Sequence, residues 1–196
     1  MSLKNTIKQL ESDLKALKRS AKAEAAFKRM SKAQKRVAVA KDVIASIKAK
    51  QLVAKARTYI DVKAEGKDGY DNNTFKHPDF QTALAMGQQC TACALGGLFV
   101  CAVKFENKIA TEDANDNIDQ PDLHDYLQHL FPYEQLQLIE IAFEQSWGIP
   151  GFDNGDDVPD KWKTAVAFGQ KHPTDDAARM TAIMRNIIRN EGTFIP

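Results

Sequence analysis

The stretch CTACALGGLFVCAV, residues 90–103, belongs to an almost continuous apolar run that decides how the rest of the chain is arranged. Spacings of three and four residues are typical of one helix face, and they align Cys90, Cys93, Gly97 and Cys101. We therefore expect a buried helix over about residues 79–105. The glycines in this helix let a second helix approach closely, although each costs about 1 kcal/mol of helix stability relative to alanine.

The three cysteines of this stretch leave alternatives open. Cys90 and Cys93 have the Cys-x-x-Cys spacing of half a zinc site, and the other candidate metal ligands are Cys101 and His77. Zinc knuckles occur in turns, however, whereas this pair lies in an apolar run. A free cysteine commonly behaves as a small buried hydrophobe. We favour core packing without a cofactor, with zinc binding or redox chemistry as the alternatives.

Outward from this stretch, the pattern predicts a mainly α protein with a minor β element. Residues 52–62 alternate apolar and polar side chains and are expected to form one strand. Polar, turn-rich loops are expected on both sides of the central helix and between later helices, at residues 63–79, 110–120 and 148–162. One helix is expected to start at Pro121, and a second is expected to start at Pro132 and to end at Gly148. The last helix is expected to be capped by Thr174 and to end at Gly192.

The N-terminal region reads as a helical arm. Apolar residues spaced by four and three form a short coiled-coil seam, made of Leu3, Ile7, Leu10, Leu14 and Leu17. A seam of this length is marginal alone and requires a partner, which could be a second copy of the chain, the next helix or another protein. Ser31 is expected to cap a second helix. We divide the chain into a basic arm, residues 1–50, and an acidic, mainly helical body, residues 51–196.

The net charge of +1 hides a strong asymmetry along the chain. Residues 1–57 carry 16 Lys and Arg against 4 Asp and Glu, whereas the remaining residues carry 11 against 22. Clustered cations bind phosphate by displacing counterions, so the arm is a candidate surface for nucleic acid or for an acidic partner. The residues expected there are Lys28, Arg29, Lys32, Lys35 and Arg36. Solvated charged faces, and attraction between the two oppositely charged parts, remain the alternatives.

Known catalytic and targeting patterns are missing from the sequence. It contains no nucleophile elbow, phosphate-cradling loop or dinucleotide fingerprint, and His124 and His129 are five residues apart rather than the four of a zinc-protease pair. We therefore expect a protein that is not an enzyme. No run of 18 apolar residues and no secretory leader is found, so a cytoplasmic protein without a membrane contact is expected.

Three segments together resemble small phage and prophage accessory proteins that carry a Cys-Ala-Leu-Gly-Ala/Gly-Leu helix. They are CALGGLFVCAV at 93–103, LIEIAFE at 138–144 and RMTAIMRNIIRNEGTFIP at 179–196. The resemblance covers roughly residues 30–196 and carries over no catalytic residues. It implies a non-enzymatic inhibitor of a bacterial defence nuclease, such as an anti-CRISPR protein, that occupies a protein or nucleic-acid surface of the nuclease or its nucleoprotein complex in the infected host's cytoplasm. This is the first hypothesis, and a non-specific DNA- or RNA-binding accessory protein is the alternative.

Overall fold

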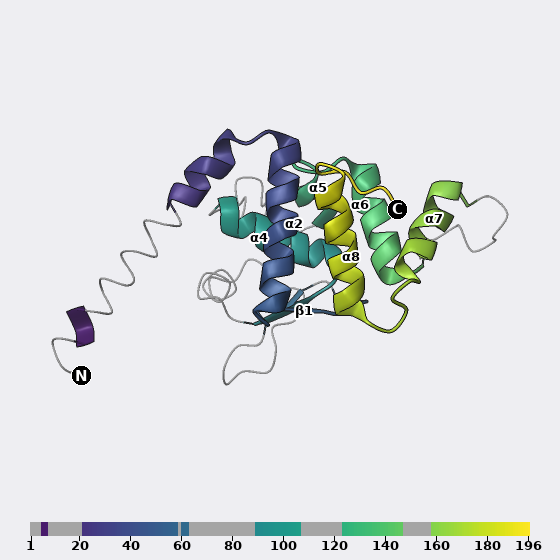
Figure 1. The fold of residues 1–196 in the computed structure, drawn as a ribbon, viewed down its shortest axis with the longest axis horizontal. Helices are drawn as coiled ribbons and strands as arrows, with labels where there is room; N and C mark the ends of the chain where they lie inside the picture. The colour runs from purple at the N-terminus through teal and green to yellow at the C-terminus, as the bar shows by residue number, and fades with distance from the viewer. Residues whose placement is uncertain (1–4, 8–20, 59, 63–88, 107–122, 147–157) are drawn as a thin grey trace, which may run out of the picture.

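The computed structural model describes residues 5–7, 21–58, 60–62, 89–106, 123–146 and 158–196 (Figure 1). Within these ranges the chain is mainly helical with a small three-stranded sheet, which confirms the predicted fold class. Residues 5–7 and 21–29 are helical. The further elements are α2 (Lys32–Lys48), β1 (Leu52–Ala54), β2 (Ile60–Val62), β3 (Cys90–Ala92), α4 (Ala94–Glu106), α5 (Leu123–Leu127), α6 (Tyr133–Glu144), α7 (Asp160–Gly169) and α8 (Asp176–Arg189).

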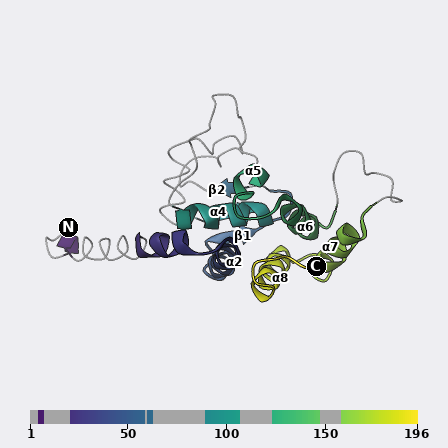
Figure 2. The same cartoon turned by 90° about the horizontal axis from the view of Figure 1, so that it is seen from above.

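Helix α4 is the centre of the core. Every residue from Ala94 to Ala102 is buried, and a helix that is apolar on all sides must be covered on all sides. Figures 1 and 2 show how this is achieved: α2 and α8 lie side by side as one layer, and α4 and α6 form the layer behind it. The prediction of a buried central helix is confirmed from Ala94 onward.

The start of this helix differs from the prediction. Residues Cys90–Ala92 form β3, the middle strand of the sheet, which pairs in parallel with β1 and antiparallel with β2. Its partners are distant in sequence: Leu52 lies opposite Cys90, and Ile60 lies opposite Ala92. The expected alignment of Cys90 and Cys93 with Cys101 on one helix face is therefore wrong. The rest of the predicted segment, residues 79–88, lies outside the described residues.

The predicted strand over residues 52–62 is in fact two strands. β1 and β2 do not pair with each other but flank β3 on opposite sides, so the chain crosses β3 between them. Arg57 has a positive φ of 60° in this crossing segment, and its backbone N–H donates to Glu144 at 2.9 Å. Ala56 donates its N–H to Asp176 at 2.8 Å. Carboxylates from two helices thus satisfy the backbone where the strand is interrupted.

Helices α2 and α8 run antiparallel. The predicted cap at Ser31 is confirmed: its hydroxyl accepts from Gln34 N–H, and the Gln34 side chain accepts from Ser31 N–H. At the other end of the pair, Gly192 follows α8 with a φ of +95°, and a Cβ there would lie 2.6 Å from the Ala33 carbonyl oxygen. The glycine both ends α8, as predicted, and lets the start of α2 approach.

Three helix boundaries in the C-terminal half differ from the prediction. Asp175, rather than Thr174, caps α8, because its carboxylate accepts from Ala178 N–H at 2.8 Å. α7 begins at Asp160, inside the segment predicted to be a loop, and packs against α6. The helix expected from Pro132 is confirmed as α6, but its predicted end at Gly148 is wrong: the helix ends at Glu144, and Gln145 takes a left-handed conformation with a φ of 56°. The predicted start at Pro121 and the loops at 63–79 and 110–120 lie outside the described residues.

The described part of the arm is docked on the body. The Phe27 ring stacks on Phe105 of α4 with centroids 4.8 Å apart, and Phe27 is only 1% exposed. Val39, Ala40 and Val43 of α2 belong to the same core cluster as α4. The expected boundary at residue 50 therefore runs through one packed unit. Of the predicted leucine seam, only Ile7 is described, and it is 48% exposed; Leu3, Leu10, Leu14 and Leu17 lie outside the described residues.

Candidate nucleic-acid interface

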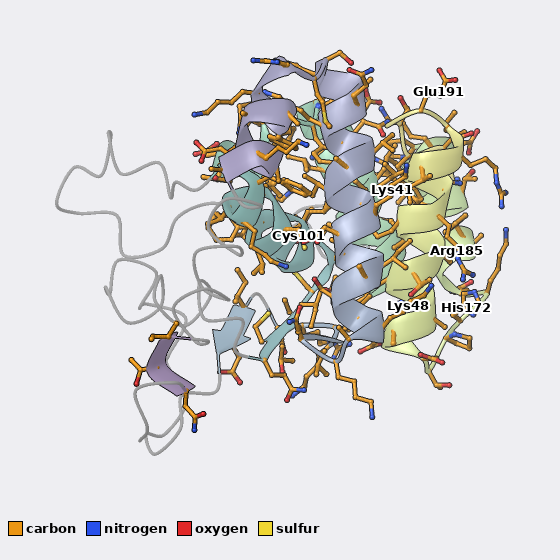
Figure 3. The ribbon with its side chains drawn as sticks, turned by 60° about the vertical axis from the view of Figure 1, so that its left-hand side comes forward. Lys41, Lys48, Cys101, His172, Arg185 and Glu191 are labelled. Atoms are coloured by element: carbon orange, nitrogen blue, oxygen red, sulfur yellow. The ribbon has the colours of Figure 1, made fainter. Side chains whose placement is uncertain are left out.

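The outer side of the α2–α8 layer carries four exposed cations, which we call the basic face: Lys41, Lys48, Arg185 and Arg189. Figure 3 labels Lys41 and Lys48 on α2 and Arg185 on the neighbouring α8. Lys48 follows Lys41 by seven positions, which is about 10 Å along the helix axis, and Arg189 follows Arg185 by four positions, which is about 6 Å. None of the four makes a hydrogen bond or ion pair with another described residue.

The carboxylates of the two helices are turned away from the basic face. Asp42, the only acidic residue within α2, binds Lys104 of α4 at 3.0 Å on the inner side of the layer. In α8, Asp176 is engaged by Ala56 N–H and by Arg179 in the first turn. Glu191 lies beyond the end of α8 (Figure 3). The middle of the two-helix surface is therefore positive without internal compensation.

The five basic residues singled out in the sequence have different environments. Lys28, Arg29 and Lys32 are exposed, and Lys28 forms an i,i+4 ion pair with Glu24 at 2.7 Å. The ammonium of half-buried Lys35 lies 5.2 Å from the centroid of the Phe27 ring. These lysines are near the start of α2, whose first turn holds no acidic residue, so the helix dipole adds to their positive potential.

Arg36, by contrast, is directed into the protein. Its Nε donates to the Gly192 carbonyl oxygen at 2.6 Å, and its Nη1 donates to the Leu130 carbonyl oxygen at 3.0 Å. The guanidinium also lies over the Phe131 ring, 5.9 Å from the centroid. Burial lowers the pKa of Arg36 below its ordinary value. These contacts brace three segments together, so the expected role in contacting a partner does not fit this side chain.

Sequence reasoning did not select Arg185 and Arg189, because they belong to the region with an excess of acidic residues. Their spacing of four on the polar side of a strongly amphipathic helix was visible in the sequence. What could not be seen is that α8 lies beside α2, which is about 140 residues earlier in the chain. The packing of these helices joins cations from both halves into one surface.

The cysteines lie in the interior, which confirms the core interpretation of their environment. Cys90, Cys93 and Cys101 are 2%, 5% and 0% exposed. Burial raises the pKa of Cys90 to about 11 and that of Cys93 to about 12, and it also raises the pKa of Cys101, which lies on α4 beside α2 (Figure 3). Thiols of this kind resist ionisation, and metal binding requires the thiolate.

Metal-binding geometry is not found in the part of the chain that the structure describes. There, no group of three or more His, Cys, Asp or Glu side chains is arranged to hold an ion. His77, the candidate fourth ligand of the zinc alternative, lies outside the described residues. The Cys93 sulfur instead accepts a hydrogen bond from Gly96 N–H at 3.4 Å, in the first turn of α4.

A second polar cluster joins the end of α4 to α5. His129 Nε2 lies 2.7 Å from Glu106 Oε1, His129 Nδ1 contacts the Tyr126 carbonyl oxygen, and the Tyr126 hydroxyl donates to Glu106 Oε2 at 3.0 Å. Both ring nitrogens of His129 lie within hydrogen-bonding distance of acceptors, an arrangement that favours the doubly protonated ring. The hydrogen bond with Glu106 also raises the pKa of His129. The cluster is thus arranged as an ion pair between His129 and Glu106.

Comparison of the chain with protein-family models, with curated proteins and with solved structures finds no match. Across the described ranges, no helix combines the length and the apolar character needed to cross a membrane. The fold and the two polar clusters are thus the observations from which a function must be argued.

Proposed function

We propose that this protein binds the phosphate backbone of nucleic acids through the basic face, without reading the base sequence. The observation that carries the proposal is the set of four exposed cations, supplied by two adjacent helices and unmatched by carboxylates within the surface. Two arginines can each engage a phosphate with two parallel hydrogen bonds, whereas the lysines act as point charges. The exposed residues Lys28, Arg29 and Lys32 would extend the contact toward the arm.

The experiment is a fluorescence-anisotropy titration of a labelled 24-base-pair duplex at 50 and 200 mM salt. Each phosphate neutralised contributes about 0.9 to the slope of log affinity against log salt. Four contacts predict a slope of about 3.6, which is roughly a 150-fold loss of affinity over this range. Full-length protein that shows no binding at 50 mM salt would refute the proposed function.

A matched pair of variants tests where the nucleic acid binds. Lys41→Gln/Arg185→Gln removes two charges from the basic face and should lower the slope by about 1.8. Lys161→Gln/Lys163→Gln removes two charges from α7, where Lys161 pairs with Glu134 and Lys163 lies 3.5 Å from Asp160. The α7 variant should retain the wild-type slope. Equal losses in both variants would show that only the total charge matters.

A second candidate function is inhibition of a bacterial defence nuclease, and the resemblance to phage accessory proteins supports it. The basic face would serve this use by competing with the nuclease, for example a CRISPR effector, for its nucleic acid. The partner would then be the host nuclease or its nucleoprotein complex in the cytoplasm of the infected bacterium. The test is cleavage by a purified effector, which near-stoichiometric protein should block while showing no cleavage of its own.

A further inference from the structure

On the basis of the proposed function, we infer that the basic face takes double-stranded rather than single-stranded nucleic acid. The first reason is the composition of the two helices. Neither α2 nor α8 contains a Phe, Tyr or Trp residue. Proteins that bind single strands without sequence preference combine a basic groove with aromatic side chains on which the bases stack, and this stacking supplies much of the affinity.

Small side chains are accessible on both helices. Ala45, between Lys41 and Lys48, is exposed, as is Ala177 on α8, while Thr181 and Ala182 are partly exposed. The larger Ile44, Ile47 and Ile188 are partly buried and pack against the core, so the accessible floor carries mainly methyl and hydroxyl groups. Such a floor offers an unstacked base neither an aromatic plane nor a pocket of aromatic side chains. A duplex needs neither, because its bases are already stacked inside and its outer surface presents phosphates.

The second reason is that the cations come from two adjacent helices. Lys41 and Lys48 lie on α2, and Arg185 and Arg189 lie on the antiparallel α8. Because Gly192 meets Ala33 at the start of α2, Arg185 is at about the level of Lys41, while Arg189 and Lys48 extend the surface in opposite directions. Packed helices have axes about 8–10 Å apart, and the phosphate walls of a groove are about 6 Å (minor) or 12 Å (major) apart. The long, flexible side chains of Lys41 and Arg185 can therefore reach both walls of one groove, whereas a single strand supplies one line of phosphates.

The experiment is a competition assay with full-length protein bound to the labelled 24-base-pair DNA duplex at 50 mM salt. The unlabelled competitors are the same duplex, a 24-base-pair RNA duplex, a 24-mer of deoxythymidine and polyglutamate. We expect the duplex to compete at least tenfold better per phosphate than the single strand. A preference of threefold or less, or a preference for the single strand, overturns the inference but leaves the proposed function standing.

The other arms give distinct outcomes. The DNA and RNA duplexes separate the two sources of a duplex backbone, and a strong preference for either one still supports the inference. Polyglutamate releases the label only if it binds the protein itself, because its charge is opposite to that of the face. The inference would be overturned if polyglutamate released the label at a carboxylate concentration lower than the phosphate concentration at which unlabelled duplex releases it. The preferred partner would then be an acidic protein.

A gain-of-function variant tests the physical reason. Ala45→Tyr places one aromatic ring on the exposed side of α2, between Lys41 and Lys48, where the helix has room for it. Stacking of one base on the ring should raise affinity for the deoxythymidine 24-mer about tenfold and leave duplex affinity within twofold. Ala45→Leu, which adds bulk without an aromatic ring, is the matched control. Equal gains for Ala45→Tyr and Ala45→Leu would count against the role assigned to the missing aromatics.

Discussion

Arg36, near the start of α2, donates a hydrogen bond of 2.6 Å to the carbonyl oxygen of Gly192, four residues before the last residue of the chain. A second hydrogen bond runs to Leu130, between α5 and α6. One charged side chain thus joins segments that are 94 and 156 residues away in sequence. The Arg36 guanidinium therefore holds the basic N-terminal part of the chain against the acidic part that contains Leu130 and Gly192.

Arg36→Gln should therefore destabilise the protein without weakening nucleic-acid binding. Hydrogen bonds to a charged group contribute about 1.5–3 kcal/mol, and the two carbonyl groups left in this half-buried site add a desolvation cost. We expect the free energy of unfolding to fall by about 2 kcal/mol in urea titrations. Lys32→Gln, an exposed change on the same helix, is the control and should have little effect on stability. A loss of binding in folded Arg36→Gln would restore the role expected from the sequence.

The fold could be predicted from the sequence wherever local signals decide it. Ser31 with Gln34 three residues later defines the start of α2, and the apolar stripe of α8 with Gly192 defines the last helix. The helix prediction was wrong at Cys90 for a physical reason: a short apolar run fits a buried strand or a buried helix equally well. Its strand state depends on pairing with Leu52, 38 residues earlier. Periodicity does not report such a partner.

The candidate site was predicted only in part for the same reason. Exposed lysines on α2 follow from helical spacing, but the α8 arginines join them through tertiary packing. Arg36 was wrongly included in the site. Its charge alone does not reveal that its guanidinium donates hydrogen bonds to carbonyl oxygens of Leu130 and Gly192. α7 was missed, although Pro159 followed by Asp160 is a helix-start signal, because glycine and aspartate precede it in a turn-rich segment.

Gly169→Ala should be among the most damaging single changes. A Cβ at Gly169 would lie 1.9 Å from the Ala142 carbonyl oxygen, so α7 would have to move away from the α6 backbone. We expect a loss of about 3 kcal/mol in the free energy of unfolding, the upper end of the usual cost of overpacking. Gly97→Ala is the matched control. Its Cβ would meet the flexible end of Leu52 at 3.2 Å, and the cost should stay within about 1 kcal/mol. Similar losses for both would contradict the close α6–α7 contact.

The leucine seam predicts a homodimer through the N-terminal helix. A seam of about two heptads is marginal alone, so dimerisation should depend on concentration. Light scattering at tens of micromolar should give the mass of two chains, and Leu10→Asp/Leu14→Asp should give the mass of one. The variant should retain the wild-type melting temperature if the body folds independently of the seam. A wild-type monomer at high micromolar concentration would refute the dimer.

The ion pair between His129 and Glu106 should make stability depend on pH. The hydrogen bond with Glu106 raises the pKa of His129 above 6.5, even though burial acts in the opposite direction. Burial alone would raise the pKa of Glu106, but the bonds from His129 and Tyr126 outweigh it and lower the pKa below 4.5. The stabilisation from the raised histidine pKa is fully present below pH 6.5 and is lost as the pH rises through the raised pKa. The stabilisation from the lowered carboxyl pKa is fully present above pH 4.5 and is lost as the pH falls through the lowered pKa.

The pair therefore contributes most between about pH 4.5 and 6.5. A double-mutant cycle with His129→Gln and Glu106→Gln measures the coupling free energy at pH 6 and at pH 9. Because 44% of the His129 side chain is exposed, solvent screens the pair, and we expect about 1 kcal/mol at pH 6 and less at pH 9. A coupling that is equal at both values, or larger at pH 9, would contradict the imidazolium assignment.

The buried thiols should be unreactive until the protein unfolds. At pH 8 the raised pKa values, about 11 for Cys90 and about 12 for Cys93, leave very little thiolate in the folded state. A disulfide reagent should modify three thiols per chain within minutes in denaturant but fewer than one in the folded protein over the same time. Rapid modification of a single thiol in the folded protein would identify an accessible, ionised cysteine.

The same experiment after treatment with a chelator addresses the zinc alternative, because removal of a bound ion would expose thiolates and accelerate the reaction. We expect the rate to be unchanged, since the burial of the three sulfurs is explained by the strand pairing of β3 and the packing of α4.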